Sequence, residues 1–159
     1  MARRPVLSPR PILLVEDDPR DAELIREALR GSGFPNSIVV CKDGTSAVTL
    51  LTSLDRNEPC VVIVDLKLPG PSGFDVIETM KADPALRDVP VVIMTGSRHE
   101  SDVVRAYQLG ANAYVVKPFG IAEFLELARE HGGFWPVTHL PPRVFDGSDR
   151  QQLRAPRPD

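Results

Sequence analysis

The sequence predicts a protein of the α/β class, in which helices cover both faces of a mainly parallel sheet. Two observations lead to this prediction. Five short apolar runs rich in β-branched residues recur along the chain, with their starts 22 to 31 residues apart. Each gap between two runs shows the spacing of apolar residues that is typical of an amphipathic helix. Alternation of these two patterns indicates βα units and a parallel sheet. The predicted strands are Ile12–Val15, Ser37–Cys41, Cys60–Val64, Val91–Met94 and Ala113–Val116.

Five helices are predicted, one after each strand. The first begins at Pro19, because proline is favourable in a first helical turn, and it ends at Gly31 and Gly33. Gly132-Gly133 ends the fifth helix. We predict a flavodoxin-like doubly wound sheet with strand order 2-1-3-4-5, followed by a C-terminal extension. The other four helices are expected at about 45–54, 73–81, 100–109 and 121–130.

Length and composition are those of one globular domain. The 159 residues are 42% hydrophobic and 26% charged, which indicates neither disorder nor a membrane fold. No apolar run approaches the roughly 20 residues that span a bilayer, and no signal-peptide pattern is present. We therefore expect a cytoplasmic protein. The net charge of −3 argues against a broad nucleic-acid-binding surface.

The two ends of the chain differ from its body in composition. We expect a flexible N-terminus at residues 1–9, one domain at 10–132, an extension at 133–142 and a flexible tail at 143–159, where no apolar period is found. Nothing after the fifth helix is long enough for a DNA-binding domain, so direct DNA binding is not expected. Phe134 and Trp135 follow the last helix, and they either pack back on the domain or contact a second copy.

Acidic residues follow two of the predicted strands. Glu16, Asp17 and Asp18 come directly after the first strand, and Asp65 follows the third. Ligands of open parallel sheets bind beyond the carboxyl ends of the strands, so these acids predict one shared negative pocket. Clustered carboxylates repel one another unless a cation offsets their charge, and Mg²⁺ prefers oxygen ligands. Capping of the next helix accounts for one acid but leaves the others unexplained.

The ends of the fourth and fifth strands add Thr95, Gly96 and Lys117 to this edge. Together with the acids they suit phosphoryl chemistry. Asp65 is the predicted phosphoacceptor, because a carboxylate can take a phosphoryl group as an aspartyl-phosphate. Lys117 is expected to pair with Asp65 before the reaction and with phosphate oxygens afterwards. Thr95 is expected to donate its hydroxyl to the phosphate, and Gly96 leaves room for that movement.

The predicted metal site lies on the acids of the same edge. Asp17 is expected to hold Mg²⁺ most directly, with help from Glu16 through water, because the ion neutralises charge on the transferring group. Asp18 is expected to be peripheral and to cap the first helix.

In their order and spacing these motifs resemble a response-regulator receiver domain of the two-component signalling family, similar to the stand-alone chemotaxis type. The resemblance covers about residues 11–131. It implies that a sensor histidine kinase donates a phosphoryl group to Asp65, with Mg²⁺ held by the acidic pair, Asp65 and the backbone carbonyl of Lys67. It also implies a cis Lys117–Pro118 bond, a shift of Thr95 toward the phosphate and an inward rotation of Tyr114. The matching motifs are Val15-Glu16-Asp17-Asp18, Asp65 with Leu68-Pro69 and Gly73, Met94-Thr95-Gly96, and Lys117-Pro118-Phe119.

A subfamily is indicated by the extension after the fifth helix and by the long connection that contains Asp83-Pro84. Both features resemble the small receivers that accompany bacterial phytochrome-type sensor kinases. This resemblance implies a light-sensing histidine kinase as partner. It also implies a homodimer built on the fourth helix, fifth strand and fifth helix and extended by the tail, with Phe134 and Trp135 as contacts.

The leading hypothesis is a stand-alone regulator that catalyses only its own phosphorylation and dephosphorylation and is not otherwise an enzyme. A phosphotransfer intermediate or phosphate sink in a phosphorelay is the nearest alternative. A Mg²⁺-dependent aspartyl-phosphate phosphatase would need a second acid two residues after the nucleophile, where the chain has Lys67. A flavodoxin-like cofactor carrier would need a phosphate-cradling loop in place of three consecutive acids. An interaction module that no longer takes phosphate is less expected, because the site is complete.

Overall fold

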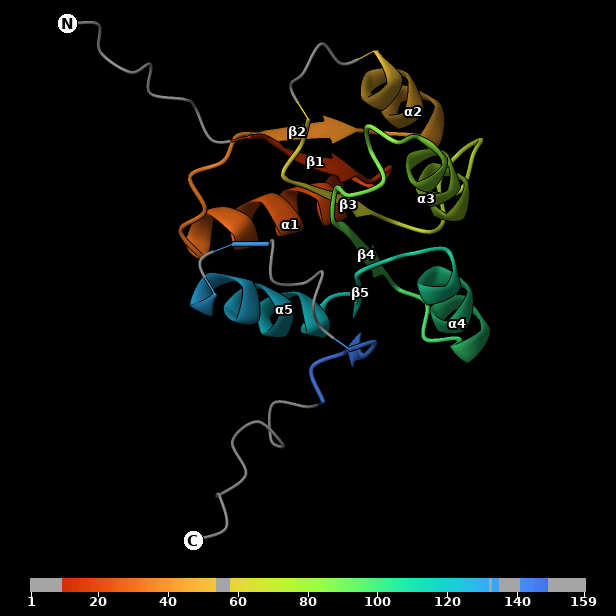
Figure 1. Cartoon of the computed structure of the whole chain (residues 1–159). Helices are drawn as coiled ribbons and strands as arrows, with labels where there is room; N and C mark the ends of the chain where they lie inside the picture. The colour runs from red at the N-terminus through yellow and green to blue at the C-terminus, as the bar shows by residue number, and fades with distance from the viewer. Residues whose placement is uncertain (1–9, 54–57, 132, 135–140, 149–159) are drawn as a thin grey trace, which may run out of the picture.

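The fold, taken from a computed structural model, is a parallel sheet enclosed between two layers of helices (Figure 1). The structure describes residues 10–53, 58–131, 133–134 and 141–148. In that part of the chain the sheet has six strands in the order β2-β1-β3-β4-β5-β6. Helices α1 and α5 cover one face, and α2, α3 and α4 cover the other (Figure 1). The predicted order 2-1-3-4-5 is therefore confirmed, with one strand added beside β5.

The observed elements follow the predicted ones closely. The strands are β1 (Ile12–Val15), β2 (Ile38–Cys41), β3 (Val61–Val64), β4 (Val91–Thr95), β5 (Ala113–Val116) and β6 (Val144–Phe145). The helices are α1 (Pro19–Gly31), α2 (Gly44–Thr52), α3 (Gly73–Ala82), α4 (Glu100–Gln108) and α5 (Phe119–Glu130).

The central strands are apolar because both of their faces are covered. Every residue of β1, β3, β4 and β5 is buried, and successive side chains enter two different cores. Val64 and Ile93 pack under α2, α3 and α4, whereas Ile63 and Met94 pack under α1 and α5. Burial of each such side chain contributes about 1.5–3 kcal/mol. The strand ends that carry the polar residues are thus fixed by a core on each side.

Side chains cap the N-termini of α2 and α3 and fix where these helices begin. Asp43 accepts a hydrogen bond from the Ser46 amide, 2.6 Å away, and caps α2. Ser72 and Asp75 cap α3 through reciprocal hydrogen bonds between side chain and backbone.

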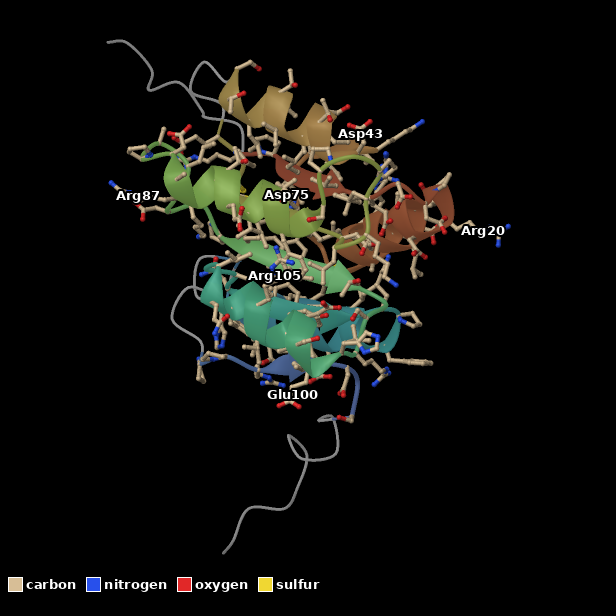
Figure 2. All side chains as sticks on the ribbon, turned by 90° about the vertical axis from the view of Figure 1, so that its right-hand side faces the viewer. Arg20, Asp43, Asp75, Arg87, Glu100 and Arg105 are labelled. Carbon is tan, nitrogen blue, oxygen red and sulfur yellow. The ribbon has the colours of Figure 1, made fainter. Side chains whose placement is uncertain are left out.

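On the same face the Arg105 guanidinium of α4 lies 4.3 Å from the centre of the Phe74 ring of α3. Figure 2 shows this face, with Asp43, Asp75 and Arg105 labelled. The caps fix the loops that lead from the strands into these helices.

The expectation of a flexible tail from residue 143 onward is wrong for residues 143–148. Val144 and Phe145 form β6, which pairs in parallel with Tyr114 and Val115 of β5. Phe145 is 1% exposed, and its ring meets that of Phe124 edge to face with the centroids 5.3 Å apart. A two-residue strand is too short to show any period in the sequence, which is why the pattern missed it.

Polar contacts hold the same segment to α5. The buried carboxylate of Glu123 accepts hydrogen bonds from Arg143 Nη2 at 2.8 Å and from the Gly147 amide at 2.7 Å. A Cβ at Gly120 would lie 1.9 Å from the Phe145 carbonyl oxygen, so only glycine permits this close approach. Residues 143–148 are therefore an integral part of the domain.

Phe134 packs back on its own domain, which was one of the two alternatives. It is 4% exposed, and its ring is stacked on that of Phe34 with the centroids 4.8 Å apart. Trp135 lies outside the described residues, as do residues 1–9, where a flexible N-terminus was expected, and residues 149–159 of the tail. Within the described ranges, no helix has the length and apolar character that crossing a membrane requires.

Candidate phosphoacceptor site

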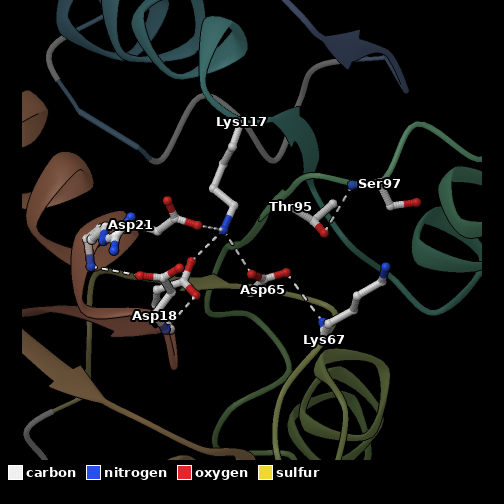
Figure 3. A network of polar contacts seen from close by, with 9 residues as sticks. Asp18, Asp21, Asp65, Lys67, Thr95, Ser97 and Lys117 are labelled. Atoms are coloured by element: carbon white, nitrogen blue, oxygen red, sulfur yellow. Dashed lines mark hydrogen bonds and ion pairs between the residues drawn. The ribbon is translucent and has the colours of Figure 1, made fainter.

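The carboxyl ends of the strands bring the predicted site residues together (Figure 3). Glu16 and Asp17 follow β1, Asp65 follows β3, Thr95 ends β4, and Lys117 follows β5. A Cβ at Gly73 would lie 2.3 Å from the carbonyl oxygen of Asp65, so glycine is needed where α3 begins against the backbone of Asp65. The Lys117–Pro118 peptide bond is cis, as the resemblance implied.

Lys117 is the centre of the polar network in Figure 3. Its Nζ lies 2.6 Å from Glu16 Oε1, 2.7 Å from Asp21 Oδ2 and 2.9 Å from Asp65 Oδ2. A lysine ammonium has three N–H donors, so each of them has a carboxylate acceptor here. Burial alone would lower the pKa of Lys117, but the hydrogen bonds that its ammonium donates to these carboxylates outweigh burial and raise the pKa above its usual value. The ammonium remains charged throughout the neutral range.

Glu16 is the most deeply buried acid of the site, at 2% exposed. Burial raises the pKa of Glu16 to about 7, and the negative charge of Asp65 adds to this, although the bond from Lys117 acts in the opposite direction. Its second oxygen, Oε2, accepts a hydrogen bond from the Asp18 amide at 3.2 Å. Both oxygens of Glu16 therefore have partners within the domain.

Glu16, Asp17 and Asp65 form a group that fits a divalent cation. Each offers one carboxylate oxygen, and these oxygens all lie within 4.8 Å of one another. Asp17 is exposed, whereas Glu16 and Asp65 are buried, so the group opens to solvent on one side. Asp65 Oδ1 also accepts a hydrogen bond from the Lys67 amide at 3.3 Å, which fixes the orientation of its carboxylate. An all-oxygen donor set with an open side suits a hard cation such as Mg²⁺.

The β4 end of the site is hydrogen-bonded to the loop before α4. Thr95 is 1% exposed, and its hydroxyl oxygen accepts a long hydrogen bond from the Ser97 amide at 3.4 Å. Tyr114 lies in an inward orientation, with its hydroxyl donating to the Ser97 carbonyl at 3.0 Å. A Cβ at Gly96 would meet nothing within 4 Å, so there is open space beside Thr95.

Asp18 caps α1 and Asp21 lies in its first turn, but only Asp21 contacts Lys117. Asp18 accepts a hydrogen bond from the Arg20 amide at 2.8 Å and caps the helix, as expected. Asp21 contacts Lys117, and sequence reasoning missed it. The available signal was its place in the first turn of the helix that leaves the acidic strand end, where a side chain can face the same edge.

Comparison with known proteins identifies the family. Residues 12–129 match the family described as "Response regulator receiver domain". The chain belongs to this family. It is a response regulator receiver domain and not a conventional enzyme.

Several individual members of the family are similar to this chain over most of its length. It is 32% identical over 134 residues to Response regulator Rcp1 of Synechocystis sp., covering 82% of this chain and 91% of that protein. The crystal structure of the Mn²⁺-bound form of response regulator Rcp1 matches with a TM-score of 0.67 at 29% identity, and the match covers 85% of this chain and 99% of that one. The bacteriophytochrome response regulator AtBRR is 45% identical, with a TM-score of 0.67 and coverage of 80% and 95%. The DNA-binding response regulator MtrA of Mycolicibacterium smegmatis is 39% identical over 118 residues, but the match spans 48% of that protein and 74% of this chain.

Proposed function

We propose that this receiver domain accepts a phosphoryl group on Asp65 in a Mg²⁺-dependent reaction and that phosphorylation changes its conformation and partner binding. The observation that carries the proposal is the position of Asp65. Its carboxylate lies 2.9 Å from the ammonium of Lys117, and one of its oxygens lies within 4.8 Å of carboxylate oxygens of Glu16 and Asp17. A nucleophile that contacts a fixed cation and belongs to a group of metal ligands matches the needs of phosphoryl transfer.

The transfer step forms one bond and breaks one. A carboxylate oxygen of Asp65 attacks the phosphorus of a phosphohistidine, the P–N bond breaks, and the imidazole leaves with the electron pair and takes up a proton. With a small acyl phosphate, the P–O bond breaks and a carboxylate leaves. When bound, Mg²⁺ supplies charge neutralisation at the phosphoryl oxygens. Glu16, Asp17, Asp65 and the Lys67 carbonyl would hold it.

The response to the phosphoryl group would begin at β4. The hydroxyl of Thr95 has only a weak bond from the Ser97 amide, at 3.4 Å, and Gly96 leaves space for it to move. Donation of this hydroxyl to a phosphoryl oxygen would pull the Thr95–Ser97 segment toward Asp65. The Tyr114 hydroxyl is bonded to the Ser97 carbonyl, so the shift would reach the face formed by α4 and β5. Such a response biases an existing equilibrium between two conformations.

The metal requirement is directly testable with a small phosphodonor. We expect acetyl phosphate to label the protein in the presence of Mg²⁺, and we expect a chelator to abolish labelling because the acids then repel the incoming anion. Intact-mass spectrometry measures the labelled fraction. The control replaces Mg²⁺ with the same ionic strength of NaCl, which should not support labelling. Labelling at an unchanged rate after chelation would rule out the metal-dependent reaction.

We further propose a phytochrome-type sensor histidine kinase as the phosphodonor, on the basis of the likeness to the bacteriophytochrome response regulator AtBRR. A phosphotransfer profile against the purified histidine kinases of the same organism tests this. Transfer should be fastest from a kinase with a phytochrome sensor. Faster transfer from any other kinase of the set would contradict the assignment.

We also propose a homodimer through the face formed by α4, β5 and α5. Val104 of α4 is 47% exposed and Phe119 at the start of α5 is 70% exposed. The side of β5 that faces away from β4 is paired with β6, so a second copy would contact the helices. Val104→Lys should weaken the dimer in light scattering at tens of micromolar, whereas Leu24→Lys on α1 should leave it unchanged. Only monomer in the unsubstituted protein, with and without a phosphoryl mimic, would refute the dimer.

A further inference from the structure

Helix α4 is held to the domain by few apolar contacts. Ala106 is the one residue of this helix that is fully buried, whereas α5 buries an apolar face that includes Phe124 and Leu125. His99, at the N-cap of α4, makes no capping hydrogen bond with its side chain. An element that buries little apolar surface shifts at a lower cost than one that is fixed in the core. The polar contacts of α4 therefore decide where it lies.

Ser97, in the loop before α4, is the residue at which several of these polar contacts meet. Its hydroxyl donates to Asp102 Oδ2 of α4 at 2.5 Å and accepts from the His99 amide at 3.3 Å. Its carbonyl accepts from the Tyr114 hydroxyl of β5 at 3.0 Å, and its amide donates to Thr95 Oγ1 at 3.4 Å. Ser97 is 7% exposed, so water competes little for these bonds. One buried residue thus joins the end of β4, strand β5 and α4.

The bond between Ser97 and Asp102 is the strongest of these contacts. A hydroxyl that donates to a carboxylate makes a short, charge-assisted hydrogen bond, and the 2.5 Å between the two oxygens has this character. The bond from the Ser97 amide to Thr95 is long by comparison, at 3.4 Å. When the Thr95 hydroxyl turns to a phosphoryl oxygen, the weaker bond is the one that yields, while Asp102 stays attached to Ser97.

We propose that Asp102 is a positioning residue that couples α4 to the phosphoacceptor site through Ser97. This inference rests on the proposed function, in which the phosphoryl group draws the Thr95–Ser97 segment toward Asp65. Because Asp102 holds Ser97 from the first turn of α4, the helix moves with that segment. Val104 of the same helix is 47% exposed, so the state of Asp65 reaches the surface of the domain.

Hydrogen exchange of the α4 amides, measured by mass spectrometry, tests the coupling. The probe is beryllium trifluoride, which in the presence of Mg²⁺ mimics the phosphoryl group on Asp65. In the unsubstituted protein we expect it to change the exchange of residues 100–108. In Asp102→Ala this change should be lost. Acetyl phosphate should still label Asp65 to completion in this variant, because Asp102 lies outside the group of acids that fits a cation.

Two further variants address the bond itself. In Asp102→Asn the amide oxygen can still accept from the Ser97 hydroxyl, although without the negative charge, so this variant should retain more of the response than Asp102→Ala. Ser97→Ala removes the hydroxyl on the other side of the same bond and should also lose the response. The double variant of Ser97→Ala and Asp102→Ala should behave like either single variant, because both remove the same contact.

Tyr107→Phe is the matched control for a helix that is merely looser. The Tyr107 hydroxyl bonds the backbone of Arg143 from the last turn of α4, so its loss loosens the other end of the helix and leaves Ser97 untouched. Without the mimic, exchange of residues 100–108 should be faster in Tyr107→Phe and in Asp102→Ala alike. Only Tyr107→Phe should keep the change that beryllium trifluoride produces.

The outcomes separate this inference from the proposed function. Loss of the change in Asp102→Ala, together with its persistence in Tyr107→Phe, supports the coupling. An undiminished change in Asp102→Ala overturns the coupling, and so does an equal loss in Tyr107→Phe, because Asp102 would then only stabilise the helix. If Asp65 is labelled but α4 of the unsubstituted protein does not respond, the coupling alone is refuted. If Asp65 is never labelled, the proposed function fails.

Discussion

Asp65→Asn should abolish labelling by acetyl phosphate and leave the fold intact. The amide has almost the same shape and can still accept the hydrogen bond that the Lys67 amide gives to Asp65 Oδ1 at 3.3 Å. It is neutral and a poor nucleophile, so it cannot form the acyl phosphate. The loss of one carboxylate also lessens the repulsion at Glu16, whose pKa is raised in part by Asp65. We therefore expect the free energy of unfolding without Mg²⁺ to be unchanged or higher.

Mass spectrometry and urea unfolding together check this prediction. The affinity for Mg²⁺ should fall by about tenfold, which is about 1.4 kcal/mol, because one of three acidic ligands is lost. Asp43→Asn is a suitable control, since Asp43 caps α2 far from the site residues in sequence and asparagine preserves the cap. It should label normally. An Asp65→Asn protein that is stably labelled would show that another residue takes the phosphoryl group.

Lys117→Ala should have the second large effect, because it removes the cation that three carboxylates share. The remaining charges at Glu16 and Asp65 would be buried without their counter-ion, and loss of one partner of a buried ion pair costs about 3–5 kcal/mol. The open side of the site admits water, so we expect a decrease of about 2–3 kcal/mol in the free energy of unfolding at pH 8 without Mg²⁺. Mg²⁺ should restore most of it. The conformational response to beryllium trifluoride should be impaired more than the binding of Mg²⁺.

The pH dependence of Lys117→Ala follows from Glu16. The pKa of Glu16 is about 7 in the folded protein against a usual value of 4.5. The folded state thus binds more protons than the unfolded state between these values, and the free energy of unfolding falls as the pH rises from about 4.5 to about 7. Without the Lys117 bond the pKa of Glu16 rises further, so the decrease should continue to higher pH and be larger between pH 5 and pH 8 in the variant. Urea unfolding at pH 5 and pH 8 measures it.

The matched control for this variant is Lys81→Ala. Lys81 is a half-buried lysine whose ammonium bonds the Arg87 carbonyl at 3.0 Å. Lys81→Ala should lower the free energy of unfolding by less than Lys117→Ala does. The difference from the unsubstituted protein should be the same at pH 5 and pH 8. Equal pH dependence in the two variants would mean that the acids of the site do not rely on Lys117.

Much of the fold could be predicted because its signals are local. The bounds of α1 were predicted closely, since Pro19 favours a first helical turn and Gly31 and Gly33 stop the apolar pattern near the observed end at Gly31. The central strands could be found because a strand covered on both faces is a continuous apolar run. The predicted site residues lie together because parallel strands bring their carboxyl ends to one edge. These predictions needed no knowledge of contacts between distant residues.

What the sequence did not reveal depends on tertiary contacts. Asp21 differs in no local way from other acids of a first helical turn, and only the reach of Lys117 across the site gives it a partner. The strand β6 has only two residues, so no sequence pattern marks it. It is recognised from its contacts, in which Phe145 packs against Phe124 of α5. Glu16 and Asp17 are adjacent in the sequence but unequally buried, and Glu16 bonds Lys117 from the far end of the chain.

The location of the phosphoryl group tests the central claim most directly. After reaction with acetyl phosphate and Mg²⁺, reduction with borohydride converts an aspartyl-phosphate to homoserine, and peptide mass spectrometry then finds the converted residue. The account predicts conversion at Asp65 alone. Conversion at Asp17 or another acid, or a phosphoryl group that resists reduction on a serine, threonine or histidine, would contradict it.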